Sequence, residues 1–166
     1  SPNLREIYDA TEVFCQKPGD PISQKQLWSS YKHHHTVKVQ IGCDSSGAIS
    51  SIGDTFGGSI SDKELFAESG DLNRLNEGEA LMVDKGYLIQ DMLQGTGVQL
   101  IRPSFLTDGQ FGDEERSNNR IVLRNRIVIE NANARIKCIT IPSQILPGKF
   151  LYIVNEIVYI CAKPSN

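Results

Sequence analysis

The sequence has no hydrophobic run long enough to cross a membrane. Its longest apolar stretch, Phe150–Ala162, is interrupted by Asn155 and Glu156, whereas a membrane-spanning helix needs about 18–20 consecutive apolar residues. The first residues include the charged Arg5 and Glu6, which interrupt any apolar stretch of the kind that a secretory signal peptide requires. We therefore expect neither a transmembrane protein nor a signal peptide.

Cysteine is scarce and unclustered. The chain contains no C-x-x-C pair and no Cys/His spacing of the zinc-binding kind, so neither a disulfide framework nor a structural zinc site is expected. We interpret the cysteines as reduced thiols of an intracellular protein. They are Cys15, Cys43, Cys138 and Cys161.

An excess of positive charge is also missing. Seventeen basic and twenty acidic side chains give a net charge of −3, which argues against a protein that coats nucleic acid, since such a protein is basic throughout. The charge is nevertheless uneven, because Arg116–Lys137 holds six basic residues and one acid, a local charge of +5. The chain of 166 residues corresponds to one domain with a sizeable core.

Hydrophobic periodicity predicts an α/β protein with a mixed sheet. Polar and apolar residues alternate with period two between Val37 and Cys43, as in a half-buried strand, and Ala80–Val83 is wholly apolar, as in a strand buried on both faces. Strands are expected at Leu4–Phe14, His35–Cys43, Ala48–Asp54, Ala80–Val83 and Val98–Arg102. Helices are expected from Ser61 or Asp62 onward, at Leu88–Leu93, over Asp113–Ile139 and after Gly148, with loops at Gln16–Ser30 and Ser104–Gly112.

Three acidic residues lie where the hydrophobic pattern makes them conspicuous. Asp9 lies inside the first strand, Asp84 ends the apolar strand, and Glu130 lies within the long helix. A carboxylate in apolar surroundings is costly to bury unless a partner neutralises it, and a divalent cation can neutralise several at once. Ligands commonly bind at the carboxyl ends of strands in such sheets. This arrangement suits phosphodiester cleavage assisted by two metal ions.

Five motifs together resemble a known family of enzymes. They are Asp9-Ala10-Thr11-Glu12, then Tyr31-Lys32 with Thr36-Val37-Lys38-Val39, then Gly58-Ser59-Ile60-Ser61-Asp62-Lys63, then Asp84-Lys85-Gly86-Tyr87, and finally Arg126-Ile127-Val128-Ile129-Glu130 with Arg135-Ile136-Lys137. In this order they resemble the catalytic domain of DDE superfamily endonucleases, the group of eukaryotic transposases related to PIF/Harbinger and to transposases with a THAP domain. The resemblance extends from about Leu4 to Ile141.

The resemblance implies a fold, a mechanism and partners. The fold would be ribonuclease H-like, a mixed sheet with helices on both faces and the first strand central. Asp9, Asp84 and Glu130 would bind Mg²⁺, with Mn²⁺ as a substitute and two ions in the site. The enzyme would cleave DNA at the ends of a transposon and join the 3′-hydroxyl to target DNA, in the nucleus and as a homo-oligomer. The chain is expected to be a single-domain fragment whose sequence-reading domain lies outside it.

Each proposed site residue also has a plainer role. Asp9 could pair with a lysine or with backbone N–H groups, and Asp84 could cap a following helix. Glu130 could pair with Arg126 one helical turn away. Asp62 is a helix N-cap or, alternatively, a residue that orients a metal ligand.

Basic side chains are candidates for contacts with the DNA backbone, the alternative being a solvated surface. They are Lys32, Lys38, Lys85, Arg120, Arg124, Arg126, Arg135 and Lys137; Lys85 could instead only balance the charge of Asp84. Metal binding by His33–His35 is disfavoured, because neighbouring strand residues face opposite ways. Trp28 and Tyr31 are interpreted as packing residues, since no basic cluster with several aromatics surrounds them.

Two other functions remain open. One is a domesticated, non-cleaving derivative that binds DNA or protein, and the other is a different nuclease of the same fold, such as a resolvase or an exonuclease. The intact set of acids argues against the first, and the motifs around Tyr87 and over Arg126–Lys137 argue against the second.

Overall fold

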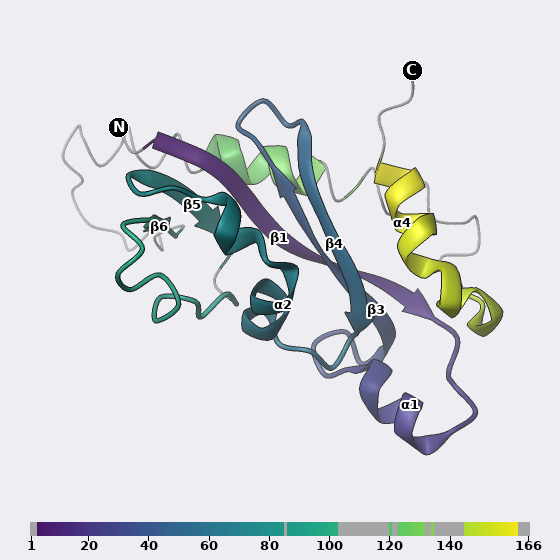
Figure 1. Cartoon of the computed structure of the whole chain (residues 1–166). Coiled ribbons are helices and arrows are strands. Elements are labelled where there is room, and N and C mark those ends of the chain that lie inside the picture. The colour runs from purple at the N-terminus through teal and green to yellow at the C-terminus, as the bar shows by residue number, and fades with distance from the viewer. Residues whose placement is uncertain are drawn as a thin grey trace, which may run out of the picture.

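The protein is built around one mixed β-sheet (Figure 1). The computed structural model describes residues 3–84, 86–102, 120, 123–131, 134 and 145–162. Five strands follow the order β2-β3-β1-β5-β6, with β4 paired to β3 and β7 paired to β1. The strands are β1 (Asn3–Cys15), β2 (Trp28–Ser29), β3 (His34–Cys43), β4 (Ile49–Gly57), β5 (Glu79–Val83), β6 (Gln99–Ile101) and β7 (Ile145–Leu146).

The first strand is the centre of the sheet, as the family resemblance implies. β1 pairs antiparallel with β3 and parallel with β5 and β7, while β3 pairs antiparallel with β4 and β5 pairs parallel with β6. β5 lies between two strands and is buried along most of its length. Burial on both faces explains the wholly apolar run Ala80–Val83, and only Glu79 at the start of the strand is partly exposed.

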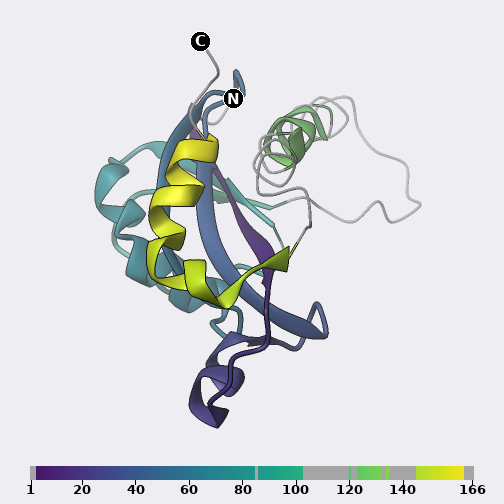
Figure 2. The ribbon, with the colours of Figure 1, turned by 90° about the vertical axis from the view of Figure 1, so that its right-hand side faces the viewer.

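Helices cover both faces of the sheet. Alternation along β1 sends Ile7 and Val13 to one face and Tyr8 to the other. On the first face Ile129, from the helix that includes residues 123–131, packs beside Ile7, and Val158 of α4 packs beside Val13. On the second face α2 packs against Tyr8, as its ring contact shows. Figure 2 shows α2 and the helix of residues 123–131 on opposite sides of the sheet.

The remaining helical segments are short. They are α1 (Pro21–Leu27), α2 (Asp62–Ser69), α4 (Val154–Ala162) and the 3-10 turns η1 (Asp71–Arg74) and η2 (Gly148–Ile153). This arrangement confirms the predicted α/β class with a mixed sheet of the ribonuclease H-like kind. In the part of the chain that the structure describes, no helix is long and apolar enough to cross a membrane.

Two of the predicted segments are wrong. The expected loop Gln16–Ser30 contains α1 and β2, because Asp20 caps the helix by accepting a hydrogen bond from Ser23 N (2.8 Å) and proline occupies the first helical turn. The expected helix Leu88–Leu93 consists of turns whose amides bond three residues back, as Met92 N does to Ile89 O (3.0 Å).

Other predicted segments lie only partly within the described residues. Within the expected helix Asp113–Ile139, residues 123–131 are helical, and the loop Ser104–Gly112 lies outside the described residues. Cys15 and Cys43 are buried thiols. Cys138 and the side chain of Cys161 lie outside the described part of the chain.

Candidate functional site

The register of the central strands brings Asp9 and Asp84 together. In the parallel ladder between β1 and β5 the last pair is Tyr8 with Val83, and the next residue on each chain is an aspartate. Asp9 and Asp84 therefore lie side by side, at the same level of the two adjacent strands. β5 ends here, whereas β1 continues and pairs with β7 from Phe14 onward. The two carboxylates thus lie at the carboxyl end of a buried strand, where ligands commonly bind in α/β sheets.

Glu130 reaches the same place from the helix above this face. Its neighbour Ile129 is 4% exposed and packs with Ile7 and Met82, which fixes the helix over the middle of β1 and the end of β5. A cavity of about 40 Å³ lies between them, room for a few water molecules or an ion. It is lined by Ile7, Tyr8, Asp9, Met82, Val83, Asp84, Arg126, Ile129 and Glu130.

The three acids have different local surroundings. Oδ1 of Asp9 accepts a hydrogen bond from Ala10 N (2.9 Å). Glu130 Oε1 lies 3.2 Å from Arg126 Nε, the pair expected for a plain helix residue, and both side chains are about half exposed, so this pair adds little stability. Asp84 is exposed and precedes a turn, in which Tyr87 N donates to its carbonyl oxygen (3.1 Å). The capping role considered for Asp84 is wrong, because the residues from Gly86 to Gly97 contain no helix.

The donor atoms at this cavity suit a hard divalent cation. Carboxylate oxygens are the ligands that Mg²⁺ takes in proteins, and three carboxylates line the cavity. In the described residues, however, no three His, Cys, Asp or Glu side chains come close enough together to hold a metal ion as they stand. The three acids therefore share a cavity and fit the cation in kind, without forming a closed set of ligands.

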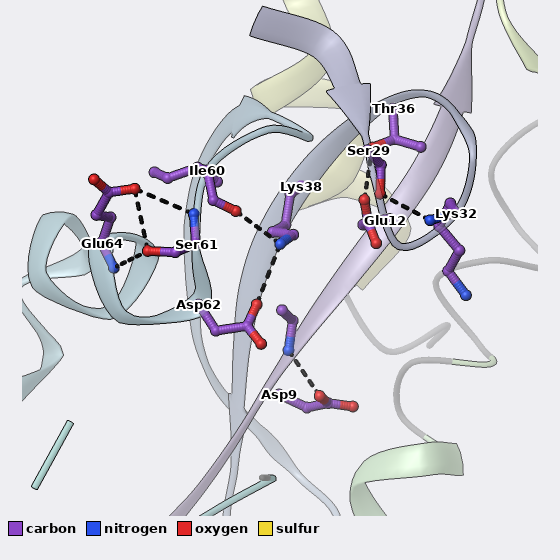
Figure 3. Close-up of polar contacts among 11 residues, drawn as sticks. Asp9, Glu12, Ser29, Lys32, Thr36, Lys38, Ile60, Ser61, Asp62 and Glu64 are labelled. Atoms are coloured by element: carbon purple, nitrogen blue, oxygen red, sulfur yellow. Dashed lines mark hydrogen bonds and ion pairs between the residues drawn. The ribbon is translucent and has the colours of Figure 1, made fainter. Parts of the chain in front are cut away.

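Asp62 does not cap its helix. The N-cap of α2 is Ser61, whose hydroxyl accepts a hydrogen bond from Glu64 N (3.1 Å) in a capping box. Asp62 Oδ1 instead lies 3.2 Å from Lys38 Nζ, which also donates to the carbonyl oxygen of Ile60 (2.8 Å). Figure 3 shows this pair beside the strand that carries Asp9. Asp62 thus forms an ion pair between α2 and β3 instead of the expected cap.

A second and larger cavity adjoins the first. Its volume is about 450 Å³, and Asp9 and Asp84 line it as well. The side of the sheet that carries α2 contributes Lys38 and Asp62, and the turn before β3 contributes Lys32. The full lining is Asp9, Ala10, Glu12, Tyr31, Lys32, Lys38, Asp62, Asp84 and Gly86. The two aspartates therefore stand where two hollows of the surface meet.

Negative charge accumulates at this end of the sheet. The hydroxyl of Tyr87 is fully buried and has no hydrogen-bond partner among the described residues. Burial raises the pKa of Tyr87 well above its ordinary value, and the charges of Asp62, Asp9, Asp71 and Asp84 raise it further. Such a field favours a cation or a hydrogen-bond donor in the adjoining cavities.

The basic candidates divide into three groups. Lys32 and Lys38 line the larger cavity, and Arg126 lines the smaller one. Arg124 is exposed on the helix of residues 123–131, which also carries Arg126, and Arg120 is an exposed helical residue. Lys85, Arg135 and Lys137 lie outside the described residues.

Tyr31 is not a packing residue. It is 81% exposed at the tip of the β2–β3 turn, in contrast to the expectation from sequence. Trp28 is 41% exposed and meets the ring of His35 edge-on, while the ring of His34 stacks on Phe14. The residues around Tyr31 do not distinguish a buried tyrosine from an exposed one at a turn, so its exposure is not predictable from the sequence.

Comparison with known proteins agrees with this geometry. Residues 8–165 match the family of DDE superfamily endonucleases, and because the match covers nearly the whole chain, the protein belongs to this family. No curated protein matches the chain. Membership supports an enzyme of the nuclease and transposase type, acting on DNA, in a family that generally uses divalent metals. The narrower relation to PIF/Harbinger transposases stays a prediction.

Proposed function

We propose that this domain is a metal-dependent DNA endonuclease and strand transferase of a DNA transposon, acting in the nucleus. The observation that supports this function best is the convergence of Asp9, Asp84 and Glu130 on one cavity from β1, the end of β5 and the helix of residues 123–131. Family membership supplies the class of reaction, and the shared cavity supplies a place for it.

In this proposal each acid has a role. Asp9 on β1 and Asp84 after the end of β5 would hold the cation, and Glu130 would complete the site from the helix. When bound, Mg²⁺ would neutralise charge on the phosphate and lower the pKa of the attacking water. Glu130 must then exchange its contact with Arg126 for one inside the site.

The reaction consists of two displacements at phosphorus. In the first, the oxygen of water bonds to the phosphorus at the end of the element, and the bond to the 3′-oxygen breaks, releasing a 3′-hydroxyl. In the second, that hydroxyl bonds to a phosphorus of target DNA while the target's own P–O bond breaks. Arg126, which lines the cavity, is placed to bind a phosphate and hold the strand there.

The decisive experiment compares Asp84→Asn with the parent. The substrate is DNA that carries the ends of the element, with Mg²⁺ or Mn²⁺, and strand nicking is measured on a gel. We expect Asp84→Asn to lower the rate at least ~100-fold, the scale typical of losing a group that stabilises charge in the transition state. Asp54→Asn is the matched control, because Asp54 is an exposed acid on β4 that lines neither cavity.

Two results would contradict the proposal. Equal nicking by the parent and by Asp84→Asn would remove Asp84 from the site. A parent that binds DNA with the same affinity as Asp84→Asn but cleaves none would indicate the domesticated binding module. Titration with Mn²⁺ gives a second readout, since Asp9→Asn and Asp84→Asn should each weaken binding of the ion while Asp54→Asn should not.

A further inference from the structure

The turn between β2 and β3 presents an aromatic ring to the cavity that contains the proposed catalytic acids. Tyr31 is 81% exposed, yet it lines the larger cavity together with Asp9 and Asp84. Another tyrosine, Tyr152, is 83% exposed but lines neither cavity. A single exposed aromatic ring is ordinary on a protein surface, so what distinguishes Tyr31 is its position on the lining of this cavity.

The turn that carries Tyr31 is held in place. Ser29 is buried and pairs with His34 in the ladder of β2 and β3, and its hydroxyl accepts a hydrogen bond from Lys32 N (3.1 Å). His33 adopts a left-handed backbone conformation (φ 51°), which is uncommon outside glycine and is typical of a tight turn. Figure 3 shows Ser29 and Lys32 at this turn. The ring is therefore presented by an ordered turn.

A second contact connects the start of β3 to β1, the strand that carries Asp9. The hydroxyl of Thr36 donates to Glu12 Oε1 (2.7 Å). Glu12 is three residues beyond Asp9 on β1, which corresponds to ~10 Å along a strand. A DNA strand advances ~3.4 Å per nucleotide in a duplex, so the contact of Glu12 with Thr36 lies about three nucleotides from a phosphate held at Asp9 and Asp84. Tyr31 precedes Thr36 and lines the same cavity as the two aspartates.

The distribution of charge favours a base over a phosphate inside the cavity. Four carboxylates line it, those of Asp9, Glu12, Asp62 and Asp84. The cation of the proposed function would offset the charge of Asp9 and Asp84, whereas Glu12 and Asp62 disfavour a phosphate beside them. Of the two lysines, Lys38 is occupied by Asp62 and by Ile60. Lys32 Nζ lies 4.8 Å from the centre of the Tyr31 ring, so the available cation stands beside the aromatic ring. A nucleobase carries no charge, and a cavity of about 450 Å³ falls in the size range of small-ligand pockets.

We propose that Tyr31 stacks on an unpaired nucleobase of the DNA strand that enters the cavity and that Lys32 contacts the phosphate next to that base. The site thus binds a single-stranded DNA segment beside the scissile phosphate. Aromatic stacking with a neighbouring cation is the usual way in which proteins bind single strands without reading sequence. This inference rests on the proposed function, since it assumes that Asp9 and Asp84 act on DNA.

The test measures binding of two oligonucleotides that differ only in their bases. One is a fluorescently labelled dT12, and the other is an abasic 12-mer with the same number of phosphates. Fluorescence anisotropy is recorded for both in the presence of Ca²⁺. The parent should prefer dT12, and Tyr31→Ala should bind dT12 about 5- to 150-fold more weakly, the range expected for loss of stacking on one base. Its affinity for the abasic strand should not change.

Three further variants separate stacking from charge and from folding. Tyr31→Phe keeps an aromatic ring and should retain the preference for dT12. Tyr152→Ala removes an equally exposed tyrosine from η2 and should bind as the parent does. Lys32→Gln should weaken binding of both oligonucleotides and lower the slope of log K against log salt by ~0.7, the value for one phosphate contact on a single strand.

The inference is overturned if Tyr31→Ala binds dT12 as the parent does, or if it weakens binding of both oligonucleotides equally. It is also overturned if Tyr31→Phe loses as much affinity as Tyr31→Ala. Its failure can be told from failure of the proposed function. Loss of nicking in Asp84→Asn with unchanged binding of dT12 by Tyr31→Ala rejects only the stacking site. Unchanged nicking in Asp84→Asn with weaker binding of dT12 by Tyr31→Ala rejects only the catalytic assignment.

Discussion

At the scale of single residues, the position of Asp62 depends on a glycine distant in sequence. A Cβ built at Gly86 would lie 2.2 Å from Asp62 Oδ2, so the backbone after Asp84 can approach this carboxylate only because residue 86 lacks a side chain. Lys38 holds the same carboxylate from β3. The motifs that contain Lys38, Asp62 and Gly86 are therefore parts of one contact.

Gly86→Ala tests this contact. We expect the added methyl group to displace Asp62 or the turn after Asp84 and to lower the rate of DNA nicking at least ~10-fold, because misplacement of catalytic groups by about 1 Å can cost up to a hundredfold. Gly19→Ala is the control, since a Cβ there meets no atom within 4 Å. Nicking at the parental rate by Gly86→Ala would show that Asp62 has no bearing on the site.

Burial also gives Cys15 a distinct dependence on pH. Its thiol is fully buried, and this burial raises its pKa from 9.0 to about 11. Between these values the unfolded chain loses the thiol proton and the folded chain keeps it, so the contribution to stability is complete below pH 9 and falls as the pH rises to 11. Urea unfolding at pH 8 to 11 should therefore show a steeper decline for the parent than for Cys15→Ser. Parallel declines in the two chains would contradict this assignment.

At the scale of elements, the short helix α2 depends on its first turn. Ser61 and Glu64 form a capping box, and Gly70 ends the helix in a left-handed conformation. Asp62 is the first residue of this helix, so the cap also fixes the residue that pairs with Lys38. A local sequence signal thereby positions a side chain at the larger cavity.

Ser61→Ala should lower the free energy of unfolding by ~1 kcal/mol, as loss of an N-cap usually does. Urea unfolding measures this directly. Ser59→Ala is the matched control, because Ser59 is exposed and precedes the helix. A loss in Ser61→Ala no larger than that in Ser59→Ala would mean that the cap contributes nothing to stability.

At the scale of the whole molecule, a net charge of −3 does not oppose binding of DNA, because charge is distributed unevenly. Acids gather on β1 and just after the end of β5, where the cavities lie, while Arg120 and Arg124 are exposed helical residues. A cation bound at the acids would offset part of the negative charge of a DNA strand, and so would the exposed arginines. The charge of the whole chain therefore conceals a surface suited to a phosphate backbone.

Arg124→Gln should weaken binding of duplex DNA about equally for all sequences and lower the slope of log K against log salt by ~0.9, the value for one phosphate contact. Lys149→Gln is the control, since Lys149 is an exposed cation on η2 that lines neither cavity. Filter binding at several salt concentrations measures both slopes. An unchanged slope in Arg124→Gln would place that arginine away from the DNA.

The sequence by itself determined the elements whose signals are local. Alternation defines β3, the apolar run defines β5, and the capping residues define the start of α2. It also singled out Asp9, Asp84 and Glu130, because each interrupts an apolar pattern. Local signals failed where the same residue types are typical of two different structures. Asp20 and Pro21 begin α1, but aspartate and proline are as typical of a loop as of the start of a helix.

Only the tertiary structure decided which of these residues meet. The parallel register of β1 and β5 places Asp9 beside Asp84, and the packing of Ile129 on Ile7 brings in Glu130. Register and packing depend on pairs of residues far apart in the chain, and periodicity carries no information about such pairs. For the same reason only the fold revealed that Tyr31 stands exposed at the cavity that Asp9 and Asp84 also line.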